Sequence, residues 1–119
     1  MDTHRLIELT KRYVDLSNQR DLAQIQTMFA ADSVYHSAFF GEYQGSQAIH
    51  TMMCNFFDRF LDAYWEIDEY RIIADNGVAF NFVMTGTDLS SGECVKRLGL
   101  EKIFFTEEYL IKQIYIYKV

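Results

Sequence analysis

The sequence predicts an α+β fold, in which helices pack on one face of a mostly antiparallel sheet. Apolar residues recur at helical spacing through the first half of the chain, whereas aromatic and β-branched runs separated by short turns occupy the second half. The chain has 119 residues, and half of them are hydrophobic, which suits one domain with a sizeable core. We therefore expect a single domain over residues 1–119.

Two helices are expected at the start of the chain. Residues 2–18 carry apolar side chains at steps of three and four, which form one face of a helix, and Asp2 or Thr3 is placed to cap it. Residues 21–30 repeat the pattern after a second capping residue, Asp21. The two apolar faces contain Leu6, Leu9, Tyr13 and Leu16 in the first helix and Leu22, Ile25 and Phe29 in the second.

A short strand and a third helix follow. Residues 34–40 are β-branched and aromatic, which is typical of a strand, and Gly41 and Gly45 then bracket a turn. Ser46 is placed to cap a helix over residues 46–62, whose broad apolar stripe predicts burial on more than one side. The stripe consists of Ile49, Met52, Met53, Phe56, Phe57 and Phe60.

The rest of the chain predicts a meander of four strands. The pair Asn76-Gly77 favours a tight primed hairpin turn between the first two of them. The last strand is apolar on both faces, one rich in isoleucine and one in tyrosine, so its orientation stays open. The expected strands are residues 64–74, 78–89, 95–106 and 110–119.

Charge and composition exclude several classes of partner. Seventeen acidic residues against 11 basic ones give a net charge of −6, which repels a phosphate backbone, so nucleic acid is not an expected partner. No run of about 18 apolar residues is present, so we expect no membrane association. The three histidines are dispersed and share no spacing with carboxylates, so no metal site is expected either.

The two cysteines bear on the cellular compartment. Cys54 and Cys94 lie far apart and match no metal-binding or redox motif, which favours free thiols and leaves a disulfide open. The start of the chain is polar and helix-like and does not have the apolar core of a signal peptide. The sequence therefore predicts a cytoplasmic protein.

The segment from Asp21 to Ile49 resembles the nuclear transport factor 2-like superfamily, which includes ketosteroid isomerases and SnoaL-type polyketide cyclases. It has an acidic helix start at Asp21, an aromatic-Ala-x-Asp step at residues 29–32, and a Gly-x-x-x-Ile opening of the third helix at residues 45–49. The order of elements matches over almost the whole chain. The resemblance implies a single SnoaL-like domain with a strongly curved sheet, shaped as a cone around an internal cavity.

The resemblance also implies two residues that stabilise an oxyanion. The ketosteroid isomerases keep a tyrosine in an Arg-Tyr-x-x-Leu context on the first helix, which Tyr13 matches, and a protonated acid ten residues before the last strand, where Glu101 lies. The residues alone leave two plainer interpretations open. Tyr13 can be an ordinary core aromatic, and Glu101 can pair with Lys112 on the adjacent strand.

The general base of the isomerases has no counterpart. Ser37 occupies its position and Ala38 that of the following proline, and a serine hydroxyl has no useful basicity without a partner. His36 is the substitute candidate, because imidazole titrates near neutral pH. Alternation along a strand puts His36 and Ser37 on opposite faces, so His36 faces out if Ser37 faces in, unless a bulge intervenes.

From these observations we expect a cavity that binds a small hydrophobic molecule. The chemistry implied by the resemblance is cofactor-free acid–base catalysis by Tyr13, Glu101 and His36 on a polyketide-, steroid- or terpenoid-like compound, of the isomerase, cyclase or dehydratase type. A non-catalytic binding or dimerisation module of the same fold is the alternative. The residues expected to contact the ligand are Tyr35, Ser37, Phe39, Met53, Phe56, Phe60, Phe82 and Ile103.

Two further expectations follow from the resemblance. Limonene epoxide hydrolase, another member, uses an Asp, Arg, Asp trio, of which Arg71 and Arg97 are the candidate arginines here. Members of the superfamily commonly form a homodimer through the outer face of the sheet. Phe104, with either the tyrosines or the isoleucines of the last strand, is the candidate for that surface.

Overall fold

The computed structural model describes all of residues 1–119 and has the predicted α+β fold. Three helices pack on a six-stranded sheet, and none of the helices combines the length and apolar character needed to cross a membrane. In chain order the elements are α1 (Thr3–Gln19), α2 (Leu22–Thr27), β1 (Phe29–Ser37), β2 (Gly41–Gln44), α3 (Ser46–Arg59), β3 (Tyr64–Ile73), β4 (Gly77–Thr87), β5 (Cys94–Phe105) and β6 (Ile111–Lys118).

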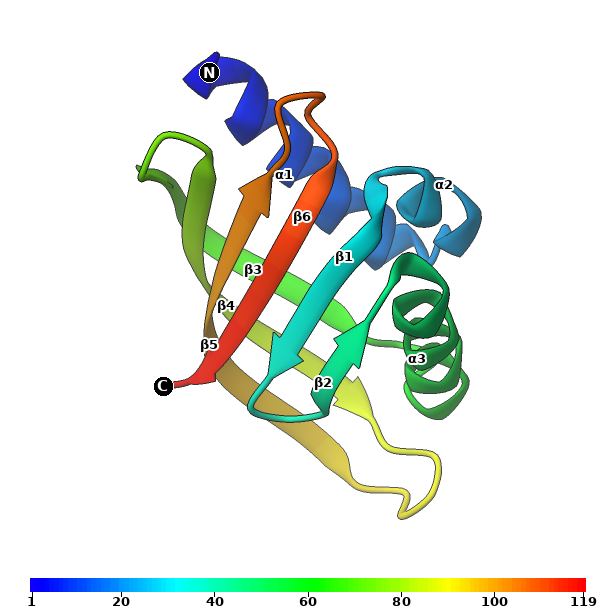
Figure 1. Cartoon of the computed structure of the whole chain (residues 1–119). Coiled ribbons are helices and arrows are strands. Elements are labelled where there is room, and N and C mark those ends of the chain that lie inside the picture. Colours follow the sequence, from blue (N-terminus) through cyan, green and yellow to red (C-terminus); the bar gives the residue numbers. More distant parts are fainter.

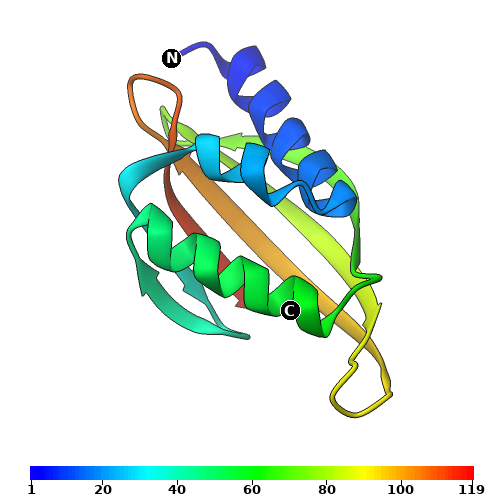
Figure 2. The same ribbon diagram turned by 90° about the vertical axis from the view of Figure 1, so that its right-hand side faces the viewer.

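The sheet curves around the helices without closing into a barrel. Its strand order is β2-β1-β6-β5-β4-β3, so β2 and β3 are free edges. All neighbouring strands are antiparallel except β1 and β6, which run parallel although they come from opposite ends of the chain. Figures 1 and 2 show the three helices together on one side of the curved sheet.

The capping residues of the first two helices are confirmed, and that of the third is wrong. Asp2 accepts a hydrogen bond from the backbone N–H of Arg5, and Asp21 accepts one from Gln24. At α3 the capping position belongs to Gly45, which has φ of 90° and offers no side chain. Its N–H instead bonds to Ser33 of β1 at 2.7 Å, so a sheet contact fixes the start of this helix.

Long-range pairing moves the boundary between the second helix and the first strand. The helix ends at Thr27 rather than at residue 30, and the strand begins at Phe29, which pairs with Ile111 of β6. The short strand β2 occupies residues that were expected to form a turn, and α3 ends at Arg59, three residues early. Sheet pairing thus overrides the local helical pattern at residues 28–30.

The hairpin between β3 and β4 differs from the expected primed turn. Ile73 pairs with Gly77, which leaves a loop of residues 74–76, and the positive φ belongs to Ala74 (52°). Asn76 has a different role, because its side chain donates to the carbonyl of Phe105 at 2.9 Å and its carbonyl accepts from the Phe105 N–H. This loop is therefore tied to the end of β5.

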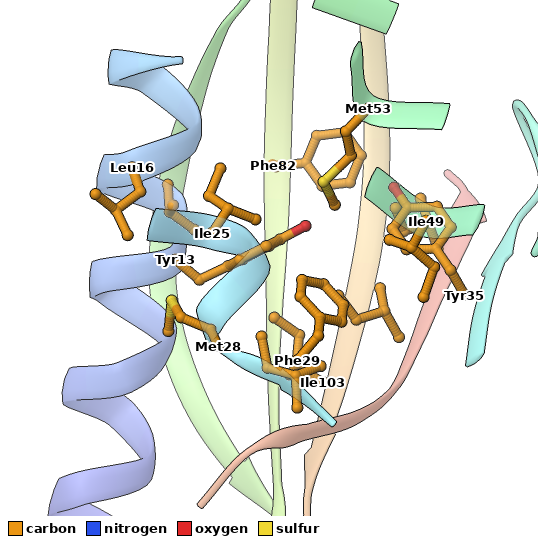
Figure 3. Close-up of a cluster of buried hydrophobic side chains, with 14 of the residues drawn as sticks. Tyr13, Leu16, Ile25, Met28, Phe29, Tyr35, Ile49, Met53, Phe82 and Ile103 are labelled. Carbon is orange, nitrogen blue, oxygen red and sulfur yellow. The ribbon is translucent and has the colours of Figure 1, made fainter. Parts of the chain in front are cut away.

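The core lies between the helices and the inner face of the sheet. Figure 3 shows part of it, with Tyr13 reaching from α1 into a cluster that includes Ile25, Met53 and Phe82. The last strand contributes Ile114 and Ile116 to the buried side, so Tyr115 and Tyr117 face outward. The structure thereby settles the orientation of β6 that the sequence left open.

Candidate functional site

An inner pocket opens between α1, α3 and the sheet, with a volume of about 60 Å³. Its walls are mainly aromatic residues and methionines, and the one carboxyl and the one guanidinium among its lining residues belong to Glu101 and Arg97. The lining residues are Tyr13, Val14, Ser17, Tyr35, Phe39, Phe40, Met52, Met53, Phe56, Phe57, Trp65, Phe80, Phe82, Met84, Arg97, Glu101 and Ile116.

Burial changes the ionisation of Glu101 strongly. Alternation along β5 turns it inward, where it is 5% exposed, and its Oε2 atom has no hydrogen-bond partner. Burial raises the pKa of Glu101 from 4.5 to about 8, because an apolar environment disfavours the carboxylate. At neutral pH the pocket therefore contains a carboxylic acid that can donate a proton or a hydrogen bond.

The alternative in which Glu101 pairs with Lys112 is wrong. The β6 residue opposite Glu101 is Ile116, and the β4 residue opposite it is Phe80. Lys112 lies on the exposed side of β6. Glu101 thus faces apolar side chains on both neighbouring strands, which explains its raised pKa.

Tyr13 and Tyr35 approach the same pocket from opposite walls. Tyr13 is on α1 and Tyr35 on β1, and Figure 3 shows their rings on either side of the buried cluster. Burial raises the pKa of both hydroxyls, and the nearby Glu101 raises it further. Both tyrosines therefore stay protonated and are hydrogen-bond donors for an oxygen atom placed beside Glu101.

Arg97 lies at another part of the pocket wall, on the same face of β5 as Glu101. Its guanidinium carbon is 5.2, 5.1 and 5.3 Å from the ring centroids of Phe39, Phe40 and Phe60, respectively. Burial and the neighbouring Arg59 lower the pKa of Arg97. Gly99 lies between Arg97 and Glu101, and a Cβ there would overlap the ring of Phe82.

His36 and Ser37 lie outside the inner pocket. The His36 ring stacks on Tyr115 at 4.7 Å on the outer face of the sheet, and its Nδ1 is 3.5 Å from a Glu42 carboxylate oxygen. Ser37 is buried, but its Oγ accepts hydrogen bonds from the N–H groups of Phe39 and Phe40 at 3.0 and 3.2 Å. The structure therefore does not bring His36 to Tyr13 and Glu101.

The expected contact residues divide into two groups. Five of them line the pocket, namely Tyr35, Phe39, Met53, Phe56 and Phe82. Ile103 and Phe60 are fully buried in the core, and Ser37 serves the turn after β1. Trp65, Phe80 and Met84 also line the pocket and were not among the expected contact residues. Alternation along β4 places Phe80 and Met84 on the same face as Phe82, so the strand pattern could have identified these two.

A wider groove of about 490 Å³ lies next to the inner pocket. It runs along α3 and shares Phe40, Met52 and Phe56 with the pocket, so these three side chains form the wall between the two spaces. At the far end of the groove Arg59 holds Asp88 through two hydrogen bonds of 2.9 and 2.6 Å. No group of three or more His, Cys, Asp or Glu side chains is arranged to hold a metal ion.

Comparison with known structures defines the class of the fold as nuclear transport factor 2-like. The epoxide hydrolase/cyclase-like enzyme SalBIII, which has a role in pyran ring formation in the polyether salinomycin, superposes with a TM-score of 0.89 at 16% identity, covering 99% of this chain and 93% of that one. A candidate polyketide cyclase from Xanthomonas campestris pv. campestris gives 0.82 at 14% identity, with coverages of 100% and 93%. An NTF2-like protein from Exiguobacterium sp. 255-15 gives 0.81 at 12%, with coverages of 92% and 97%.

The chain belongs to the SnoaL-like domain family, whose model matches residues 10–106. The matched range includes Tyr13, Arg97 and Glu101 and ends before the last strand. A search of curated proteins finds no significant match. The family and fold expected from the sequence are thus confirmed. Identities of 12–16% to the solved structures support the shared fold and no statement about a shared activity.

Proposed function

We propose that the inner pocket binds a small, mainly hydrophobic molecule and that Glu101 acts on it as a cofactor-free acid. The observation that carries the proposal is the unpartnered carboxyl of Glu101, buried among apolar side chains with a pKa raised to about 8. Such a group is costly to the fold unless a ligand uses it. The substrate class is a polyketide-, steroid- or terpenoid-like compound, in keeping with the cyclase among the structural neighbours.

Ring closure is the reaction that suits these groups best. The O–H bond of neutral Glu101 breaks as its proton passes to the oxygen of a C–O bond that opens in the ligand, such as an epoxide. A hydroxyl of the same ligand forms the new C–O bond, and its proton returns to the Glu101 carboxylate. Tyr13 and Tyr35 donate hydrogen bonds to the oxygen on which charge develops.

A route that begins with proton abstraction is less suited to this pocket. Ser37 stands where the isomerases keep their base, and its hydroxyl is already engaged by the N–H groups of Phe39 and Phe40. This observation favours a second candidate function, in which the domain binds a ligand without transforming it. In that case Glu101 and Tyr13 serve as polar anchors.

The pocket is smaller than the several hundred cubic ångströms of typical ligand sites. A ligand of the proposed class therefore needs space from the adjoining groove, which requires Phe40 or Met52 to move from the shared wall. Phe40 lies in the turn between β1 and β2, which leaves it freer to move than side chains on the strands. We propose this turn as the entrance.

A substrate screen tests the two candidate functions. Hydroxy-epoxides and enones are incubated with the wild type, Glu101→Gln and Tyr13→Phe, with His36→Ala as a matched change outside the pocket. We expect turnover by the wild type and His36→Ala and a loss of about 100-fold or more in Glu101→Gln. Binding without turnover in every protein supports the non-catalytic module, and equal turnover in wild type and Glu101→Gln contradicts the acid role.

We also propose that the outer face of the sheet forms a homodimer. Leu98 and Tyr117 are 47% and 44% exposed there, and Phe104 contacts Tyr115 on the same face. Apolar side chains on an open sheet face favour association. Light scattering at micromolar concentration measures the assembly. We expect a dimer for the wild type and a monomer for Tyr117→Glu, and a monomeric wild type would contradict the proposal.

A cytoplasmic location is proposed as well. Cys54 and Cys94 are both unpaired, and unpaired cysteines are typical of a reducing compartment. Cell fractionation of the native host tests this, and recovery of the protein outside the cytoplasm would contradict it.

A further inference from the structure

We infer that Arg97 is an anion-binding residue of the inner pocket, and that the ligand is a hydrophobic carboxylic acid whose carboxylate lies against this guanidinium. The inference rests on the proposed function, because it adds Arg97 to Glu101 as a second polar group in the proposed ligand pocket. It narrows the substrate class from apolar compounds in general to those with one negative charge.

The first observation is that Arg97 has no partner of its own. Its Nη1 atom is buried without a hydrogen bond, and no ion pair in the structure includes it. The carboxylate whose charge acts on Arg97, that of Asp88, is itself engaged by Arg59 and by Ser90. A buried guanidinium nitrogen without an acceptor costs free energy until one is supplied.

The second observation is that aromatic rings hold the guanidinium in place. Phe39, Phe40 and Phe60 surround Arg97 at just over 5 Å, so the group is positioned and partly desolvated before any ligand binds. Its planar fork then suits the two oxygens of a carboxylate, which accept parallel hydrogen bonds. A phosphate dianion would need further donors, and Arg97 is the one cationic residue in the lining.

The third observation is the charge of the pocket. Glu101 is neutral at pH 7, since its pKa is raised to about 8, so the lining carries one positive charge in a protein whose net charge is −6. Lys118 adds a second cation nearby, with its Nζ atom 5.4 Å from the centroid of the Phe39 ring. An anionic ligand is therefore attracted to this site although the protein as a whole repels it.

Strand geometry sets the length of the ligand. Arg97 and Glu101 are four residues apart on β5, which places their Cα atoms about 13 Å apart in an extended strand. No ion pair joins the two side chains. A molecule that reaches both has a carboxylate at one end, an oxygen function at the other, and an apolar body against the aromatic walls.

The test compares a matched pair of probes by calorimetry. One is 5-oxo-5-phenylpentanoate, which has a ketone and a carboxylate, and the other is its neutral primary amide. We expect the wild type to bind the acid about tenfold or more tighter than the amide, as for other charge-assisted hydrogen bonds. Arg97→Met should abolish this preference and leave the affinity for the amide within about twofold, and Arg97→Lys should restore part of the preference.

A control on the same strand separates local binding from general charge. Lys102 is also on β5 but faces outward over Tyr117, so Lys102→Met removes one positive charge without touching the pocket. It should keep the wild-type preference for the acid. If the wild type binds acid and amide equally well, the proposed anion site is wrong, whereas the proposed ligand pocket is still supported. A preference that survives Arg97→Met also overturns it, and binding of neither probe contradicts the pocket itself.

Discussion

The raised pKa of Glu101 makes the stability of the protein depend on pH in a way that one substitution removes. In the unfolded chain this carboxyl ionises near pH 4.5, whereas in the folded protein it holds its proton to about pH 8. Between these values the folded state binds more protons than the unfolded state, so the free energy of unfolding falls as pH rises. Glutamine at this position has nearly the same shape and cannot ionise.

The magnitude follows from the shift. A difference of one pKa unit corresponds to about 1.4 kcal/mol, so ionising Glu101 lowers the free energy of unfolding by about 5 kcal/mol over the whole range. About 4 kcal/mol of this loss in the free energy of unfolding is expected between pH 5 and pH 9. From pH 5 to pH 9 the free energy of unfolding of Glu101→Gln should therefore rise by about 4 kcal/mol relative to that of the wild type. The other titrating groups contribute equally to both proteins and cancel in this difference.

Urea denaturation followed by the fluorescence of Trp65, the single tryptophan, measures this difference at each pH. The matched control is Glu66→Gln, which removes an exposed carboxyl and should follow the wild type within about 0.5 kcal/mol. If the difference between wild type and Glu101→Gln changes by less than about 1 kcal/mol from pH 5 to pH 9, Glu101 ionises without penalty. The acid role proposed for it would then be refuted.

Three further substitutions test the assignment of residues to pocket, core and outer face. Gly99→Ala places a methyl group against the ring of Phe82, and we expect a loss of about 1–3 kcal/mol in the free energy of unfolding and weaker ligand binding. An unchanged stability in urea denaturation and an unchanged affinity in calorimetry would contradict the tight contact. Ile103→Val should cost about 0.5–1.5 kcal/mol and leave probe affinity unchanged, because Ile103 is fully buried in the core; a large change in affinity would place it in the pocket. His36→Ala removes a ring that stacks on Tyr115 on the outer face, so turnover and probe affinity should stay at wild-type levels, and loss of turnover would restore His36 as a catalytic residue.

The sequence predicts the fold class because the fold class depends on short-range regularities. Helical spacing identifies the inward face of α1 that includes Tyr13, whereas the choice of Tyr13 and Glu101 as site residues comes from the family resemblance and stays a prediction. Side chains alternate between the two faces of a strand, so Arg97 and Gly99 lie on the same face of β5 as Glu101. The sequence alone therefore contains enough information to place Arg97 on the pocket side.

Other features could not be predicted because they depend on partners distant in the chain. The strand β2 is four residues of mainly exposed, polar character and has no hydrophobic alternation to mark it. The early end of α2 follows from the pairing of Phe29 with Ile111, which no local pattern contains. The small volume of the pocket depends on the rotamers of several large side chains, and composition does not determine these.

The parallel pairing of β1 with β6 also sets an order of folding. β1 joins the rest of the sheet through β6 alone, and the paired residues are about 80 positions apart in the chain. Closing so long a loop is slow, and during synthesis it must wait until β6 has left the ribosome. The wall that carries Tyr35 is therefore completed last, and a chain shortened before Ile111 would keep Glu101 but leave its pocket without one side.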